Sequence, residues 1–269
     1  MLTNPRSDRV RSVAALAKRS VRERTGRFAV EGPQGVREAV RHAPHRVRDV
    51  YLTPEAAARH ADDIVGPAVR ADLWVHEVSP DVLAAMADAE APQGVLAVVD
   101  DEPTSLGRVL GARPRLLVLL THVRDPGNAG TVIRGADAAG ADAVLVSQGS
   151  VDVRSPKVVR STAGSLFHLP VVTGVGLDVG LEAVRAAGLR VLAADGAGST
   201  LLPEADLTGP HCWVMGNEAW GLPEELRRRC DDVVRVPIHG LAESLNLAMA
   251  ATVCLYTSAE VHRRNGIGG

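Results

Sequence analysis

The chain has few cysteines and few aromatic residues. Its three cysteines are Cys212, Cys230 and Cys254, and no two of them form a C-x-x-C pair. An odd number without that spacing argues against a disulfide framework and against a zinc site, and it is typical of a reducing cytoplasm. Aromatic residues make up only 3% of the chain, so Ala, Val and Leu must build the core. We therefore expect a cytoplasmic protein without a structural metal.

Long hydrophobic runs are also missing. No apolar stretch approaches the roughly 20 residues that a membrane helix needs. The N-terminus has no hydrophobic core of the kind found in signal peptides. These two absences predict a protein that neither crosses nor binds a membrane.

Charge is distributed unevenly along the chain. Residues 1–48 hold twelve basic and four acidic residues, a net charge of +8, whereas the whole chain carries −2. A basic segment on an otherwise acidic protein fits a polyanionic partner, and it also fits a solvated helix face. Charge alone leaves both interpretations open.

Short apolar runs alternate with segments of helical periodicity, which predicts an α/β protein with a mostly parallel sheet. A first, smaller series of alternating strands and helices ends near residue 100. A charged crossing with Pro and Gly, residues 100–114, separates it from a second series of apolar runs. We assign residues 1–105 to one domain and 114–265 to a second. A helix is expected over residues 8–21. The strands expected in the second domain are L-L-V-L-L, A-V-L-V-S, L-P-V-V, R-V-L-A-A, C-W-V-M and V-V-R-V-P.

Three polar, glycine-containing clusters follow three of these runs, at residues 125–134, 215–222 and 236–248. Ligands bind beyond the carboxyl ends of the strands in open α/β sheets, so the clusters predict a site assembled from separate segments. In the first cluster, Asn128 is expected to cap a helix. In the second, Gly216 allows a ligand to approach the backbone closely.

A glycine-rich turn after L-P-V-V offers a rival interpretation. Gly174, Gly176 and Gly180 precede Asp195 by about the spacing of a dinucleotide-binding fingerprint. The glycines are spaced one residue too widely for that pattern, and the strand before them is not the first of its domain. A plain β–α loop is favoured, but a nicotinamide-dependent oxidoreductase or a Rossmann-type methyltransferase stays open.

The three clusters together resemble the motifs of the SpoU/TrmH group of SPOUT RNA methyltransferases. The first motif is matched by Asn128, Gly130, Thr131 and Arg134, the second by G-N-E-A-W-G-L, and the third by V-P-I-H-G-L-A-E-S-L-N-L-A. Residues 155–172 resemble the rRNA-modifying branch. F-A-V-E-G-P-Q-G-V-R-E-A-V, near residue 30, is similar to the substrate-binding domain of that branch, which has an L30e/L7Ae-like fold.

The resemblance implies a trefoil knot in the C-terminal domain and S-adenosylmethionine as methyl donor, with no metal. The reaction would be methyl transfer to a ribose 2′-hydroxyl in structured RNA, and the rRNA-modifying branch implies 23S rRNA as that RNA. Arg134 would take the hydroxyl proton or grip the substrate phosphate. By position in the motifs, the orienting residues carry over to Asn128, Glu218, Ser244 and Asn246, and the donor contacts to Ala194, Gly216, Val236, Ile238 and Leu245.

The family also implies a homodimer through the knotted domain, with Val253, Leu255 and Tyr256 of the final helix as candidate contacts. RNA would be the partner of the basic N-terminus, and DNA, which lacks the 2′-hydroxyl, would not. The expected phosphate contacts are Arg19, Arg22 and Arg24. Few aromatic residues in the first 100 predict recognition by shape and phosphates instead of base stacking. An RNA-binding assembly factor with a degenerate site is a further alternative, against which the intact motif residues argue.

Overall fold

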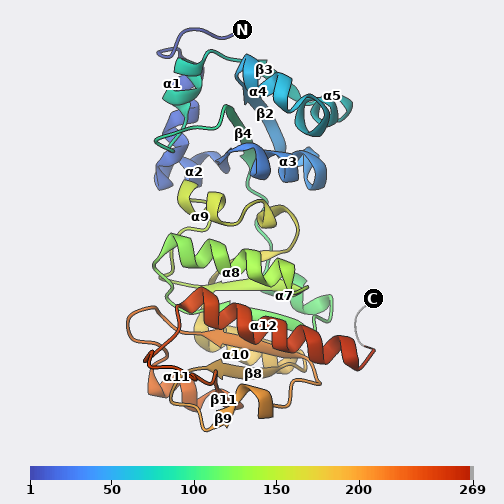
Figure 1. Cartoon of the computed structure of the whole chain (residues 1–269), viewed down its shortest axis with the longest axis vertical. Helices are drawn as coiled ribbons and strands as arrows, with labels where there is room; N and C mark the ends of the chain where they lie inside the picture. Colours follow the sequence, from blue (N-terminus) through green and yellow to red (C-terminus); the bar gives the residue numbers. More distant parts are fainter. Residues whose placement is uncertain (267–269) are drawn as a thin grey trace. The chain divides into compact units, whose positions relative to one another are not determined.

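The computed structural model describes residues 1–266 (Figure 1). The chain forms two compact units. The first consists of Met1–Glu102 and Asp152–His168, and the second of Pro103–Val151 and the chain from Leu169 onward. The chain first passes from one unit to the other between Glu102 and Pro103, which lies within the linker expected at residues 100–114. The segment 152–168 differs from that expectation, because it packs with the first unit although it interrupts the second in the sequence.

The first unit is built on a four-stranded sheet of order β1-β4-β2-β3. The strands are β1 (Arg27–Glu31), β2 (Val47–Leu52), β3 (Trp74–Glu77) and β4 (Val95–Asp100). β4 pairs antiparallel with both β1 and β2, and β2 pairs parallel with β3. The helices are α1 (Asp8–Ala14), α2 (Arg19–Thr25), α3 (Pro33–His42), α4 (Pro54–Arg59), α5 (Gly66–Arg70), α6 (Pro80–Met86) and α9 (Pro156–Ser161).

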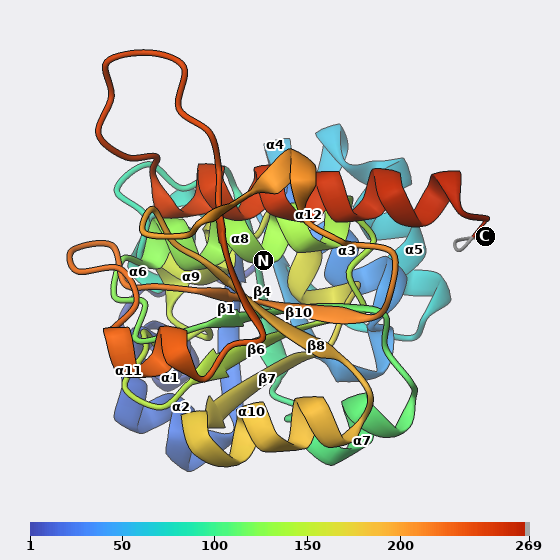
Figure 2. The same ribbon diagram turned by 90° about the horizontal axis from the view of Figure 1, so that it is seen from below.

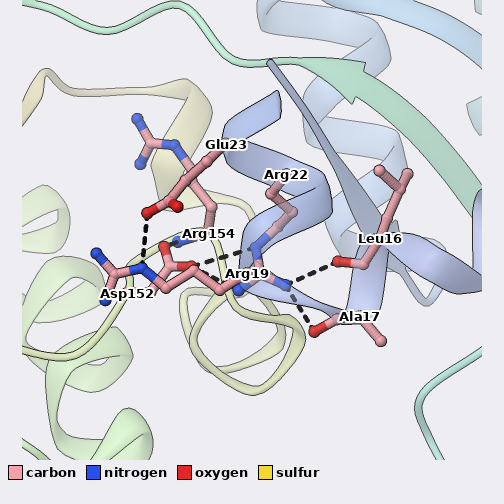
Figure 3. Close-up of polar contacts among 7 residues, drawn as sticks. All are labelled: Leu16, Ala17, Arg19, Arg22, Glu23, Asp152 and Arg154. Atoms are coloured by element: carbon pink, nitrogen blue, oxygen red, sulfur yellow. Dashed lines mark hydrogen bonds and ion pairs between the residues drawn. The ribbon is translucent and has the colours of Figure 1, made fainter. Parts of the chain in front are cut away.

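The helix expected over residues 8–21 is broken at Lys18, whose backbone is extended. The break leaves the carbonyl groups of Leu16 and Ala17 available, and Arg22 Nη1 donates to both at 2.7 Å. The other edge of the same guanidinium pairs with Asp152 (Figure 3). The Arg22 side chain is only 7% exposed, and its buried donors are thereby satisfied.

Ion pairs explain why residues 152–168 belong to the first unit. Arg154 Nε lies 2.7 Å from a carboxylate oxygen of Asp101, and Arg160 Nη1 lies 3.1 Å from one of Glu31. The Glu31 side chain is 7% exposed. α9 also packs against β1. These partners are 53 and 129 residues apart in sequence, so hydrophobic periodicity does not reveal them.

The second unit contains a seven-stranded, all-parallel sheet of order β7-β6-β5-β10-β8-β11-β9. α8 and α12 cover one face and α7 and α10 the other (Figure 2), which confirms the predicted α/β fold with a parallel sheet. The strands are β5 (Leu116–Leu120), β6 (Ala143–Ser147), β7 (Val171–Val175), β8 (Arg190–Ala194), β9 (Thr200–Leu201), β10 (His211–Met215) and β11 (Asp232–Arg235). The helices are α7 (Leu106–Gly111), α8 (Pro126–Ala138), α10 (Leu177–Ala186), α11 (Glu224–Arg228) and α12 (Leu247–Arg264).

Strand β10 is buried at the centre of this sheet and is joined to α12 by polar contacts. Ser258 Oγ accepts a hydrogen bond from Trp213 Nε1 at 2.9 Å and lies 2.8 Å from His211 Nε2. Burial lowers the pKa of His211 to about 4, so the imidazole is neutral at pH 7. Among the helices of residues 1–266, none has the length and apolar character of a membrane span.

Candidate active site

The three polar clusters lie at the carboxyl ends of β5, β10 and β11, as predicted. β5 and β10 are neighbours in the sheet, and β8 lies between β10 and β11. β8 therefore brings a fourth segment, Ala194 and Asp195, to the same edge. The site is assembled from four strand ends that span more than 100 residues of sequence.

Asn128 does not cap α8, contrary to the expectation from the sequence. The helix begins at Pro126 and its N-cap is Asp125, whose carboxylate accepts the backbone N–H of Asn128 at 2.7 Å. Proline is favoured in a first helical turn because it has no N–H to leave unsatisfied. Pro126 therefore allows the helix to begin closer to the N-terminus than Asn128. The Asn128 side chain is consequently free for contacts outside the helix.

Those contacts join the three clusters. Asn128 Nδ2 donates to Glu218 Oε1 at 3.3 Å, and Asn128 Oδ1 accepts from Asn246 Nδ2 at 2.9 Å. Asn246 is the N-cap of α12, and its own Oδ1 accepts the N–H of Ala248. The start of α12 is thus fixed to the first turn of α8 through one amide pair, and three of the predicted site residues meet.

Glu218 holds the loop between β5 and α8 in place. Its carboxylate accepts the backbone N–H groups of Arg124 at 3.3 Å and Asp125 at 3.1 Å, besides the Asn128 amide. The side chain is exposed as well as anchored, so a ligand at this edge would meet a carboxylate that is fixed in position.

Glu218 is carried by a closed turn after β10. Asn217 and Gly221 exchange two backbone hydrogen bonds of 2.9 Å, and Asn217 Nδ2 donates to the carbonyl of His122 at 2.6 Å. A Cβ placed on Gly216 would lie 2.4 Å from the carbonyl carbon of Gly221. Only glycine fits at position 216, because the obstructing atoms belong to the backbone.

A cavity of ≈ 560 Å³ opens beside this turn, within the size range of small-molecule sites. All five residues expected to contact the donor line it, together with Glu218 and Ser244 of the expected orienting residues. These five are Ala194, Gly216, Val236, Ile238 and Leu245.

The lining suits a cationic nucleoside such as S-adenosylmethionine. Asp195, Glu218 and Glu243 place carboxylates around the cavity, and the half-exposed Ile238 and Leu245 supply apolar surface. Asp195 is already neutralised by Arg227 Nη1 at 2.9 Å. Glu218 and Glu243 outnumber the one other basic residue of the lining, Arg235, so the cavity keeps an excess of negative charge, and the apolar side chains suit a purine ring.

Arg134 is not joined to this network. It is exposed on α8 and is absent from the cavity lining, and within residues 1–266 it forms no hydrogen bond or ion pair. The predicted RNA contacts also differ among themselves. Arg22 is buried against Asp152, whereas Arg19 pairs with Glu23 at the surface (Figure 3). Arg24 is exposed.

The sheet order removes the basis of the nicotinamide interpretation. The Gly174 turn lies at the end of β7, which is an edge strand. Asp195 follows β8, and three strands, β6, β5 and β10, separate β8 from β7 in the sheet. In a dinucleotide fold the glycine turn and the ribose-binding acid stand on neighbouring strands. Asp195 is instead used at the cavity, where it also accepts the N–H of Leu222 at 3.2 Å.

The sequence-based site omitted Arg124, Asp125, Asp195 and Trp220. Asp125-Pro126 is a helix-start signal that could have identified the cap. The guanidinium carbon of Arg124 lies 5.5 Å from the centre of the Trp220 ring. No short motif signals that contact, because the two residues come from different strand ends.

Comparisons with known proteins agree with this geometry. The SpoU rRNA methylase family matches residues 115–256, and the MRM3-like substrate binding domain matches residues 7–97. A 23S rRNA (uridine(2479)-2′-O)-methyltransferase from Streptomyces viridochromogenes is 37% identical, covering 90% of this chain and 86% of its own length. A 23S rRNA (guanosine(2553)-2′-O)-methyltransferase from Bacillus subtilis is 31% identical, covering 95% and 97%.

A solved structure matches nearly the whole chain. The AdoMet-bound rRNA methyltransferase from Sinorhizobium meliloti superposes with a TM-score of 0.82 at 30% identity, covering 98% of this chain and 97% of its own. The family match covers more than half of the chain and includes every residue of the Asn128–Glu218–Asn246 network. The chain belongs to the SpoU rRNA methylase family.

Proposed function

We propose that this protein is an S-adenosylmethionine-dependent methyltransferase that acts on a ribose 2′-hydroxyl in 23S rRNA. The observation that carries the proposal is the cavity beside β10, on which all five expected donor contacts converge. The two relatives described above methylate this hydroxyl on different 23S nucleotides. The target nucleotide therefore depends on RNA contacts specific to each protein.

The donor supplies a methyl group on positively charged sulfur, which is already a strong electrophile. The residues of this chain then have to position the acceptor and deal with its proton. Asn128, Glu218 and Asn246 form a hydrogen-bonded network that reaches the cavity through Glu218, and Ser244 lies in the cavity lining. They orient the ribose relative to the methyl group.

Arg134 binds the phosphate next to the target ribose. Its guanidinium is exposed and unpaired within residues 1–266, so two N–H groups are available for a bidentate contact. Guanidinium keeps its proton at neutral pH, which makes phosphate binding and polarisation of the hydroxyl a better role than that of a base.

The first unit binds the RNA. It contains the segment matched by the MRM3-like substrate binding domain, and an L30e-like fold is proposed for it. Arg19 and Arg24 supply phosphate contacts, which make binding salt-dependent. Arg22 has instead a structural role through Asp152.

The second unit forms a trefoil knot and a homodimer. β10 lies between β5 and β8 in the sheet although it follows both in sequence, which fits a threaded chain.

The candidate dimer contacts lie on α12. Met249, Val253 and Tyr256 recur there at helical spacing and are 64%, 41% and 46% exposed. Leu255, a contact expected from the sequence, is fully buried in its own protomer, so it cannot be one. The protein works in the cytoplasm.

The test is a methylation assay with radiolabelled S-adenosylmethionine and 23S rRNA, followed by mapping of 2′-O-methyl sites. Arg134→Ala should lower turnover at least 100-fold, since binding and alignment of the acceptor are lost, while donor affinity stays within about threefold. Arg108→Ala, at an exposed site on α7, is the matched control. RNA binding without methyl transfer would favour an assembly factor, and NAD binding without donor binding would favour an oxidoreductase.

A further inference from the structure

The turn after β10 presents a large aromatic ring to solvent. Trp220 is 54% exposed, although the turn that carries it is closed on both sides by the hydrogen bonds between Asn217 and Gly221. Ala219 and Gly221, its sequence neighbours, both line the donor cavity. The indole therefore stands beside the cavity on a hydrogen-bonded turn, and it offers the kind of amphipathic aromatic surface that is enriched at binding interfaces.

A cation accompanies the ring. The guanidinium carbon of Arg124 lies 5.5 Å from the centre of the indole, within the range of a cation–π contact. The backbone N–H of Arg124 also donates to Glu218, which belongs to the same turn as Trp220. The ring and the guanidinium are thus held together by the contact that organises the active site.

Two carboxylates in the same loops are fixed in position by N–H donors, which anchor them without removing their charge. Asp125 accepts the N–H of Asn128, and Glu218 accepts three N–H groups. Arg124 remains as the basic side chain beside the ring. An indole face next to a guanidinium is complementary to an unpaired nucleobase with its phosphate, because the ring stacks on the base and the cation attracts the phosphate.

We infer that Trp220 and Arg124 form a stacking subsite for an unpaired base in the RNA loop that carries the target ribose. This inference rests on the proposed function and adds a recognition mode that the scarcity of aromatic residues had argued against. It also gives a physical source of preference for unpaired positions, because stacking requires the base to leave its helix and costs least in loops and mismatches.

The test compares RNA binding by wild type, Trp220→Ala and Trp220→Phe. The probes are a fluorescein-labelled 12-nucleotide single-stranded RNA and a 12-base-pair RNA duplex. Trp220→Ala should weaken single-strand binding about tenfold or more and leave duplex binding unchanged, and Trp220→Phe should stay within about threefold of wild type. Val179→Ala, at an exposed apolar site on α10, is the control. In a Trp74→Phe background, the single-stranded RNA should quench the remaining exposed indole, since Trp213 is buried.

Equal single-strand binding by Trp220→Ala and wild type would overturn the inference. A change in oligomeric state on light scattering would overturn it too, because the ring would then face a second copy of the chain. Donor affinity, measured by calorimetry, should be the same in all variants. If single-stranded RNA binds through Trp220 but no RNA is methylated, the subsite stands and the proposed function fails.

Discussion

Replacing Asp152 with Asn should destabilise the first unit by removing the partner of a buried cation. The Arg22 side chain is 7% exposed and that of Asp152 22%. Breaking a buried ion pair typically costs about 3–5 kcal/mol. Arg22 keeps the carbonyl acceptors of Leu16 and Ala17, and Asp152 is partly solvated, so we expect a loss at or just below the bottom of that range, about 2–3 kcal/mol. Asparagine retains the oxygen that accepts the N–H of Arg154.

The measurement is urea unfolding followed by circular dichroism, with hydrogen exchange of peptides from α2 and α9 to locate the loss. Glu23→Gln is the matched control, because it breaks a surface pair with Arg19 on the same helix. Exposed pairs contribute about 0.5 kcal/mol or less. Exchange rates should rise in both helices for Asp152→Asn only. If the two variants unfold at the same urea concentration, the buried pair does not fasten residues 152–168 and the reasoning fails.

Three further predictions concern the second unit. Gly216→Ala should reduce donor affinity at least tenfold on calorimetry, because its Cβ would collide with the Gly221 backbone; unchanged affinity would refute the packing argument. Asn246→Ala should cost about 1 kcal/mol of stability in urea by removing the α12 cap, and Asn246→Asp should retain most of it. The buried neutral His211 should make stability fall as pH drops from about 6.5 to about 4, because only the unfolded chain gains a proton there. The total loss is about 3 kcal/mol, and His211→Asn should flatten the slope measured by urea unfolding at pH 7 and pH 5.

The strands β5, β6 and β10 were predictable because every residue in them is buried, so that each reads as an apolar run in the sequence. The two-residue strand β9 was not predicted. L-L-V-L-L became β5, and C-W-V-M became most of β10. Helix starts were less accurate. α8 begins at Pro126, ahead of the Asn128 that was expected to cap it, since Asp125 and Pro126 together form a strong start signal for a helix.

Long-range order was not predictable from local patterns. No periodicity places β8 between β10 and β11, so Asp195 was first considered as a ribose-binding acid of a different enzyme class. The pairing of Arg22 with Asp152 joins residues 130 apart, and charge counting therefore assigned Arg22 to RNA. The donor contacts came from the family motifs and all line one cavity, while Arg134 stays a prediction.

The segment Asp152–His168 limits how this protein can be divided. A fragment ending near residue 105 would expose Arg22 and Glu31 without their carboxylate and guanidinium partners, so it should express poorly by itself. A domain exchange with a related methyltransferase at that point would transfer only part of a folding unit. Successful chimaeras should therefore exchange two stretches of sequence together, and evolution of target choice in such proteins must satisfy the same condition.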